Sequence, residues 1–307
     1  MSASTGTKGL WIYFLARLFT CLALLLPFAL LTWLACRAGD FIYFFFPKRR
    51  KIALENLERA FGATMSRRKK RTVARLAFQN MALSSAELFL IPKTLKDARG
   101  RFRIHNRHHM DEALQKGLGM ILVVAHLGSW EYLAFLSYLT SVPLSVVVKD
   151  LHNRHFAHEI TRLRRMTHTV PISKKNSIRQ MVRVLKKNHI AAVLIDQWAG
   201  REGIWQDFFG HETSSTSIPA RLALRLGSAL VPAYCFRTSP GHYDIEIHPA
   251  VTVNGTDEHE LTRKLNELLE TQIKARPDQW LWMHSRWKPK PATVREAAEI
   301  SDLSDAL

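Results

Sequence analysis

The chain is poor in cysteine and in acidic residues. Its 307 residues include only three cysteines, Cys21, Cys36 and Cys235, and none belongs to a C-x-x-C pair. This scarcity argues against a disulfide framework and against a zinc ribbon. Asp and Glu number 26 against 44 Lys and Arg, which gives a formal net charge of +18. Such a basic balance predicts an anionic partner: nucleic acid, anionic lipid or an acidic protein.

The sequence also lacks internal repeats and low-complexity linkers. With 47% hydrophobic and 23% charged residues, it is too apolar for a disordered protein and can bury a sizeable core. We expect an N-terminal membrane anchor (1–47), a basic helical membrane-proximal region (48–110), an α/β core (111–292) and a C-terminal tail (293–307). The basic region and the core are expected to form one domain.

One hydrophobic run is long enough to cross a bilayer. Leu18–Cys36 contains 19 residues without a charge. A helix of that length rises about 28 Å, close to the roughly 30 Å hydrocarbon core. Pro27 is expected to kink this helix without preventing it from spanning. The alternative is a cleaved signal peptide, which would have a shorter apolar region followed by a small-residue cleavage site. No clear site of that kind follows this run, so we expect an uncleaved, single-pass anchor.

Positive charge is concentrated directly after the anchor. The run Lys48–Lys51 reads Lys-Arg-Arg-Lys, and the positive-inside rule then puts the body of the protein in the cytoplasm. Between Lys48 and Arg107, 17 Lys and Arg oppose 4 Asp and Glu. We interpret this region as a surface that lies on anionic headgroups, although a solvated charged face is the plainer alternative. No nucleic-acid recognition motif is found, so nucleic acid is not an expected partner.

Short apolar runs alternate with helical stretches after residue 110. Strands are expected there at 120–125, 144–148, 169–172, 190–195, 230–236 and 243–248, and helices at 129–139, 156–166, 177–187, 219–226 and 261–273. The basic region before residue 110 is expected to hold two further helices, at 53–61 and 66–91. Ser66 is the expected N-cap of the second helix, and Pro92 is expected to end it. The alternation predicts an α/β fold with a mixed, largely parallel sheet flanked by helices. Residues 197–217 show neither pattern and are expected to form an irregular binding loop.

A histidine stands at the end of the first predicted core strand, in the sequence MILVVAHLGSWE (120–131). Ligands bind at the carboxyl ends of strands in such sheets. The glycine turn can bring the His126 ring to the Glu131 carboxylate, which would fix the tautomer and leave the other ring nitrogen to take a proton. The N–H groups of residues 128–130 could serve a developing oxyanion. From spacing alone, a histidine satisfied at a strand end explains the pattern equally well.

The segment His126–Glu131 resembles the HxGNWE form of the His-x4-(Asp/Glu) motif of bacterial lysophospholipid-acyltransferase-like enzymes. It is most similar to the late acyltransferases of lipid A biosynthesis, the lauroyl and myristoyl transferases. Further motifs of that family follow in the same order: Asp196-Gln197, Gly203–Gly210 (GIWQDFFG), Pro219-Ala220, Val231-Pro232 and Pro277–Lys288 (PDQWLWMHSRWK). The resemblance extends from the N-terminus to about Pro291 and is therefore far more specific than His-x4-Glu alone.

This resemblance implies an enzyme of the inner membrane that moves a fatty acyl chain from a thioester donor to a lipid hydroxyl. The donor would be acyl carrier protein, with acyl-CoA as the alternative, and the acceptor a lipid A precursor or a related anionic glycolipid. His126 would deprotonate the hydroxyl while Glu131 orients the ring. The transfer would be direct, so we expect no cofactor and no metal, and Cys235 is expected in the core rather than as a nucleophile.

The resemblance also implies residues that support the reaction. The family's essential arginine falls on Arg164 or on Arg165. Asp196 and Gln197 are implied site residues, although the pattern alone also allows Asp196 to be a loop cap at a strand end. Gly128 and Ser129 would support the substrate or the transition state. The last of the family's motifs, Pro277–Lys288, is the closing motif. Its tryptophans, Trp280, Trp282 and Trp287, could form an interfacial belt, but we expect them mainly in the core with some membrane-facing area.

Two other functions are compatible with the sequence. One is an acyltransferase of the same clan that uses acyl-CoA to acylate another glycolipid, such as a phosphatidylinositol mannoside, or a lysophospholipid. The other is a membrane-tethered lipid-binding protein without catalysis, against which the intact His126/Glu131 pair argues.

Overall fold

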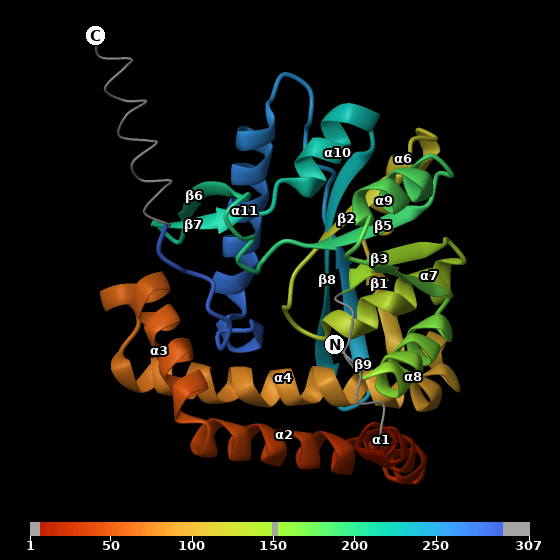
Figure 1. Cartoon of the computed structure of the whole chain (residues 1–307), viewed down its shortest axis with the longest axis vertical. Helices are drawn as coiled ribbons and strands as arrows, with labels where there is room; N and C mark the ends of the chain where they lie inside the picture. Colours follow the sequence, from red (N-terminus) through yellow and green to blue (C-terminus); the bar gives the residue numbers. More distant parts are fainter. Residues whose placement is uncertain (1–6, 149–152, 291–307) are drawn as a thin grey trace.

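A central seven-stranded sheet organises the molecule, with helices packed against both of its faces (Figure 1). The computed structural model describes residues 7–148 and 153–290, and the predicted tail at 293–307 lies outside them. The strand order is β1-β9-β8-β2-β5-β3-β4, and every neighbouring pair is parallel except β8 and β9. The predicted α/β fold with a largely parallel sheet is confirmed.

The elements follow the predicted alternation closely. The strands are β1 (Phe102–His105), β2 (Met120–Val124), β3 (Leu144–Val148), β4 (Thr169–Ser173), β5 (Ile190–Leu194), β8 (Ala229–Ser239) and β9 (His242–Ile247), and a separate pair β6 (Ile204–Phe208) and β7 (His211–Ser215). The helices are α1 (Thr7–Leu25), α2 (Phe28–Phe45), α3 (Pro47–Phe61), α4 (Arg67–Leu95), α5 (Ala98–Arg101), α6 (His108–Gln115), α7 (Phe135–Thr140), α8 (Arg154–Arg165), α9 (Ser177–Leu185), α10 (Ile218–Leu226) and α11 (Glu258–Ala275). Short 3-10 helices are η1 (Gly62–Thr64), η2 (Trp130–Ala134) and η3 (Pro277–Gln279).

Strand β2 lies at the centre of the sheet because all five of its side chains are apolar and buried. Successive side chains of a strand point to opposite faces. Ile121 and Val123 accordingly pack in one core cluster, and Met120, Leu122 and Val124 pack in the other. A helical layer therefore covers each face of β2.

The tryptophans of the closing motif and the last cysteine belong to this core. Trp280, Trp282 and Trp287 are all buried, so they form no interfacial belt. Cys235 lies inside β8 and is fully buried, which confirms the prediction that it is a core residue. Burial raises the pKa of its thiol well above the usual value and keeps it protonated.

Helix α4 confirms one boundary prediction and contradicts another. The Ser66 hydroxyl caps its start by accepting a hydrogen bond from the amide of Lys69, as predicted. The helix does not end at Pro92 but continues to Leu95. The ring of an internal proline removes one helical hydrogen bond. Burial of the flanking Ile91 and Thr94 offsets that loss, and the Thr94 hydroxyl lies 2.7 Å from the hydroxyl of Tyr132.

The predicted single helix over Leu18–Cys36 is wrong, because the chain breaks at residues 26–27. Helix α1 ends at Leu25 and α2 begins at Phe28, with Pro27 in an extended conformation between them. Proline also disfavours helical geometry in the residue before it, so the helix is interrupted here and not merely kinked. Figure 1 shows α1 end-on while α2 runs across the view beside α4. Among the described residues, α2 alone is long and apolar enough to cross a membrane.

Two local predictions also differ from the structure. Residues 197–217 are not irregular throughout but contain the antiparallel hairpin β6–β7. Its two-residue turn is Phe209-Gly210, both with positive φ, which is the geometry that favours tight hairpins. The helix predicted at 129–139 begins as the 3-10 helix η2 and becomes α-helical only at Phe135.

Candidate active site

The register between β2 and β5 brings two polar side chains together at the carboxyl end of the sheet. Val124 of β2 lies opposite Leu194 of β5 in parallel pairing. The amide of Ile195 then donates to the carbonyl of Val124 at 3.0 Å, which extends the register one residue further. His126 and Asp196 each lie two residues after the paired Val124 and Leu194. Because they follow adjacent parallel strands at the same distance along the chain, their side chains lie side by side.

The Asp196 carboxylate holds both the ring and the backbone of His126. Nδ1 of His126 lies 2.9 Å from Oδ1 of Asp196, and the His126 amide donates to Oδ2 at 3.0 Å. The indole N–H of Trp280 donates to the same Oδ2 at 3.0 Å. A carboxylate at Nδ1 requires a proton on that nitrogen, so Nε2 is left as the basic nitrogen of the ring.

The contact between His126 and Asp196 shifts the pKa of both groups. Burial by itself lowers the pKa of the His126 imidazole, but the charge and the hydrogen bond of Asp196 more than offset it and leave the pKa above its usual value. Burial raises the pKa of Asp196, and the contacts from His126 and Trp280 reverse that effect and hold it below the usual value. Asp196 is therefore an anion at neutral pH and stabilises the imidazolium.

The expected bond between Glu131 and the His126 ring is not what the structure shows. Glu131 instead forms a two-pronged ion pair with Arg164, with Nε and Nη2 of the guanidinium at 3.1 and 2.7 Å from the two carboxylate oxygens. Its negative charge still helps to raise the pKa of His126, since the two groups are near neighbours. Arg165 is exposed on α8, so Arg164 is the arginine that reaches this site.

The predicted oxyanion donors are only partly available. The amide of Gly128 donates to the carbonyl of Gln279 at 3.1 Å, and the amide of Ser129 donates to the carbonyl of Cys235 at 2.7 Å. Both N–H groups therefore hold the turn in place and do not face a substrate oxygen. Gly128 has a φ of +68°, and a Cβ there would lie 2.2 Å from the Cys235 carbonyl oxygen, so only glycine fits.

Beneath this turn lies a buried polar support that sequence reasoning missed. Glu87 of α4 accepts from Nε of Arg237 at 2.7 Å and from the Ser129 hydroxyl at 3.3 Å. Asn80 of α4 accepts from Arg237 at 3.1 Å and donates to the Gly128 carbonyl at 3.1 Å. Residues of α4 and β8 thus fix the backbone that follows His126. The only sequence signal was an isolated acid in a basic helix.

Arg286, from the closing motif, ties the segment after Asp196 to the hairpin. It is fully buried, and its guanidinium donates to the Gln197 carbonyl at 3.1 Å and to the Ser215 hydroxyl at 2.7 Å. Burial lowers the pKa of Arg286 to about 10, although nearby Asp196 opposes the shift. Gln197, a predicted site residue, contributes its backbone here while its side chain is exposed. Arg286 therefore braces the strand end that carries Asp196.

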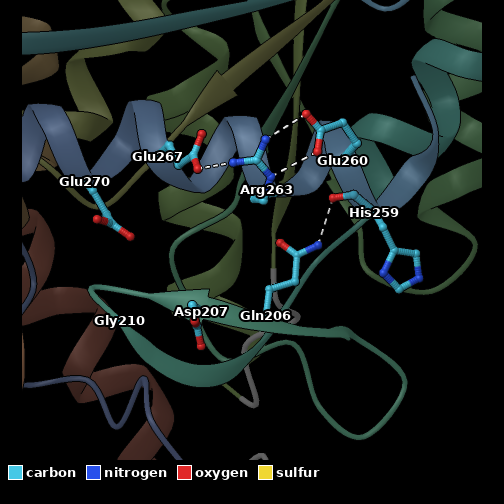
Figure 2. Close-up of a pocket in the computed structure, with 8 residues that line it drawn as sticks. All are labelled: Gln206, Asp207, Gly210, His259, Glu260, Arg263, Glu267 and Glu270. Atoms are coloured by element: carbon cyan, nitrogen blue, oxygen red, sulfur yellow. Dashed lines mark hydrogen bonds and ion pairs between the residues drawn. The ribbon is translucent and has the colours of Figure 1, made fainter. Parts of the chain in front are cut away.

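A separate polar hollow lies between the hairpin and α11 (Figure 2). Its charged groups largely satisfy one another, since Arg263 pairs with both Glu260 and Glu267. Neither His126 nor Asp196 lines it. The arrangement with acid–base chemistry is thus the one at the end of β2, where an oriented imidazole presents a basic nitrogen and an ion pair stands close by.

Comparisons with known proteins give this geometry a context. A family model described as bacterial lipid A biosynthesis acyltransferase matches residues 3–289. The chain is 26% identical over 271 residues to the lipid A biosynthesis palmitoleoyltransferase of Escherichia coli, covering 87% of each chain. It is 25% identical over 275 residues to the lipid A biosynthesis lauroyltransferase of the same species, covering 88% of this chain and 89% of the relative. It is also 25% identical over 193 residues to the phosphatidylinositol mannoside acyltransferase of Mycobacterium tuberculosis, covering 62% and 61%.

Proposed function

The chain belongs to the bacterial lipid A biosynthesis acyltransferase family, and we propose that it transfers a fatty acyl chain from a thioester to a lipid hydroxyl with His126 as the general base. The observation that carries this proposal is the contact between Nδ1 of His126 and Asp196, which orients Nε2 as an acceptor of a proton. A positioned general base of this kind contributes roughly 10²–10⁴-fold to a rate.

In the proposed reaction, Nε2 of His126 removes the proton of the acceptor hydroxyl as its oxygen attacks the thioester carbonyl. The new carbon–oxygen bond forms, the tetrahedral intermediate collapses, and the carbon–sulfur bond breaks. The imidazolium returns its proton to the leaving thiolate. Asp196 stabilises the imidazolium between these steps, and its contacts to the His126 amide and to Trp280 hold it in place. Atoms and charge balance without a covalent enzyme intermediate.

Glu131 and Arg164 form the second working pair of the proposed site. Each side chain is only about one-fifth exposed, so the pair is held rigidly near the imidazole. The Glu131 charge favours the imidazolium. Arg164 orients Glu131 and offers a guanidinium that suits a phosphate or the oxygen that develops charge. Glu131 thus acts on the ring through space, while Asp196 acts through a hydrogen bond.

We propose acyl carrier protein as the donor and a lipid A precursor as the acceptor. The net charge of +18 suits both, since the carrier protein is acidic and the acceptor is anionic. The alternative is an acyl-CoA-dependent enzyme that acylates another glycolipid or a lysophospholipid. The relatives themselves are split, because they include lipid A and phosphatidylinositol mannoside acyltransferases.

The proposed location is the cytoplasmic face of the inner membrane, where a soluble donor meets a lipid acceptor. The basic residues that follow α2 support this location, since Lys and Arg beside a membrane-bound segment are attracted to the anionic lipids of the cytoplasmic leaflet. A single-pass anchor stays a prediction that rests on α2, and the packing of that helix against α4 favours another arrangement.

A donor and acceptor panel tests the proposed function. The purified full chain is incubated with acyl carrier protein or CoA thioesters of several lengths, and with lipid A precursors, phosphatidylinositol mannoside or lysophospholipid. Mass spectrometry then reads the acylated lipid. We expect one added acyl chain on a lipid A precursor from the carrier protein. Product only on another lipid, or only from CoA, would support the alternative enzyme, and no product from any pair would favour a lipid-binding protein.

A further inference from the structure

The first two helices carry most of the large apolar side chains that are exposed among the described residues. On α2 they recur at helical spacing and include Leu30, Trp33, Leu34, Phe41 and Phe45. On α1 they include Trp11, Leu15, Leu18 and Leu22. Scattered exposed leucines are ordinary, but many large apolar residues gathered on two helices at one end of the molecule (Figure 1) mark an interaction surface.

The opposite face of α2 is fastened to the body of the protein. Gly39 packs so closely against α4 that a Cβ there would lie 2.5 Å from the Cα of Gln79. Asp40 accepts from Nε and Nη2 of Arg75 at 2.6 and 2.9 Å, and from Gln79 at 2.7 Å. A helix that carries a buried carboxylate paired to a neighbouring helix along its length cannot be surrounded by lipid.

The corner between α1 and α2 is fixed to α4 as well. The ammonium of Lys93 donates to the carbonyls of Leu24 and Leu26 at 2.9 and 2.7 Å, which are groups left open where α1 ends. The guanidinium of Arg101 stacks 4.4 Å from the centre of the Phe28 ring. Farther along α1, Arg17 pairs with the buried Glu159 of α8 at 3.6 Å. Both helices therefore lie along the body rather than project from it.

Cations stand at the C-terminal end of α2 and beside its apolar residues, and they identify the partner of this face. The exposed Lys48, Arg49 and Lys51 directly follow the exposed Phe44–Phe46. Arg37 of α2 is half exposed and pairs with Asp40 at 2.9 Å. Apolar side chains bordered by exposed cations match the interface of an anionic bilayer, where the rings reach the acyl boundary and the cations meet headgroups. A second copy of the chain would instead bring two basic borders together.

We propose that α1 and α2 lie in the plane of the membrane, as a monotopic platform bound to an anionic bilayer surface, and do not span it. In this arrangement the outer faces of both helices enter the interface to a depth of about 5–10 Å. The inner faces stay on α4 and α8.

The platform also sets the distance of the proposed active site from the membrane surface. This consequence rests on the proposed function, whereas the platform itself does not. Helix α4 packs on α2 through Gln79, and on another side it holds the Gly128 carbonyl through Asn80 and Ser84. Packed helix axes lie about 8–10 Å apart. The turn after His126 thus stands one helical layer above the interface, within reach of a sugar hydroxyl in a lipid headgroup.

A depth profile along α2 distinguishes the platform from a span. Spin labels are placed singly at Leu30, Leu34, Phe41 and Phe45 in a Cys21→Ser/Cys36→Ser full chain, bound to vesicles of phosphatidylethanolamine and phosphatidylglycerol. Relative accessibility to oxygen and to a polar nickel complex reports depth. The platform predicts the same shallow depth at all four positions. Depth that rises to a maximum near the middle of α2 and falls again would overturn the proposal in favour of a span.

Vesicle flotation tests the face itself without any reference to catalysis. Leu34→Glu/Phe41→Glu should weaken binding to anionic vesicles by about tenfold or more, since each side chain loses its burial in the interface. The matched control, Leu268→Glu on α11, alters a similarly exposed apolar residue away from this face and should bind normally. Equal binding by both variants, or a wild-type chain that ignores vesicles and dimerises, would overturn the platform. Acyl transfer is measured separately, so a failure of the proposed reaction would be recognised as such.

Discussion

Asp196 and His126 meet because they occupy equivalent positions after two adjacent parallel strands, and their side chains lie 2.9 Å apart. The carboxylate is buried, ionised and held by three N–H donors, two of them from His126 itself. This geometry assigns the orientation of the ring to Asp196 and gives Glu131 a longer-range electrostatic role. Each assignment leads to a measurable difference.

Replacing Asp196 with Asn should lower kcat by about a hundredfold or more while KM changes little. The amide preserves the shape but no longer stabilises the imidazolium or enforces the Nδ1–H tautomer. Asp207→Asn on the hairpin is the matched control, since that carboxylate is exposed. Steady-state kinetics of both variants measures the effect, and a near-normal kcat in Asp196→Asn would show that the contact is structural only.

The rate should rise with pH through the raised pKa of His126. Only the neutral imidazole accepts a proton, and the raised pKa means that neutralisation is completed at a higher pH than for an ordinary histidine. In Asp196→Asn the opposing effect of burial dominates, so the pKa should fall below that of the native chain. Titration of the His126 ring by NMR measures both values independently of activity. An unchanged or raised pKa in the variant would contradict this account of the pair.

Replacement of Arg164 and replacement of its neighbour Arg165 should have sharply different effects on catalysis. Arg164→Ala removes the partner of Glu131 and should reduce kcat/KM by about tenfold or more, since loss of a charge-assisted pair costs roughly 1.5–3 kcal/mol. Arg165→Ala is the matched control one residue away, and its exposed side chain predicts near-normal kinetics. Losses of equal size in both variants, or in neither, would remove Arg164 from the site.

Two glycines with nearly equal φ allow a clean test of the turn after His126. Gly128→Ala introduces both left-handed strain and a clash with the Cys235 carbonyl, and should lower the free energy of unfolding by about 3 kcal/mol or more. Gly210→Ala in the hairpin turn adds a Cβ in open space and should cost only about 1–2 kcal/mol. Denaturant unfolding compares the two, and equal losses would mean that the close approach at Gly128 is unimportant.

Much of the fold could be predicted because its signals are local. The buried run at β2, the Ser66 cap and the amphipathic pattern of α11 each depend on a few adjacent residues, and each is confirmed. Pro92 and Pro27 show the limit of such rules. The same residue type is tolerated inside α4, where packing is dense on both sides, and separates α1 from α2, where the fold requires a corner.

The pairing within the site could not be predicted for a different reason. His126 and Asp196 were both expected at the sheet edge, but their contact depends on β2 and β5 being neighbours although β3 and β4 lie between them in sequence. Proximity in sequence favoured Glu131 as the partner of the ring. Its bond to Arg164, 33 residues away, depends on the placement of α8, which no local pattern specifies.

Acyl transfer by a purified His126→Ala chain tests the central claim most directly. The lipid product is quantified by mass spectrometry beside the native chain and the control His105→Ala, which alters an exposed histidine. The account predicts that His126→Ala retains the circular dichroism of the native chain and makes no more than about one-hundredth of its product, while His105→Ala is unaffected. Near-native product from a folded His126→Ala chain would contradict it.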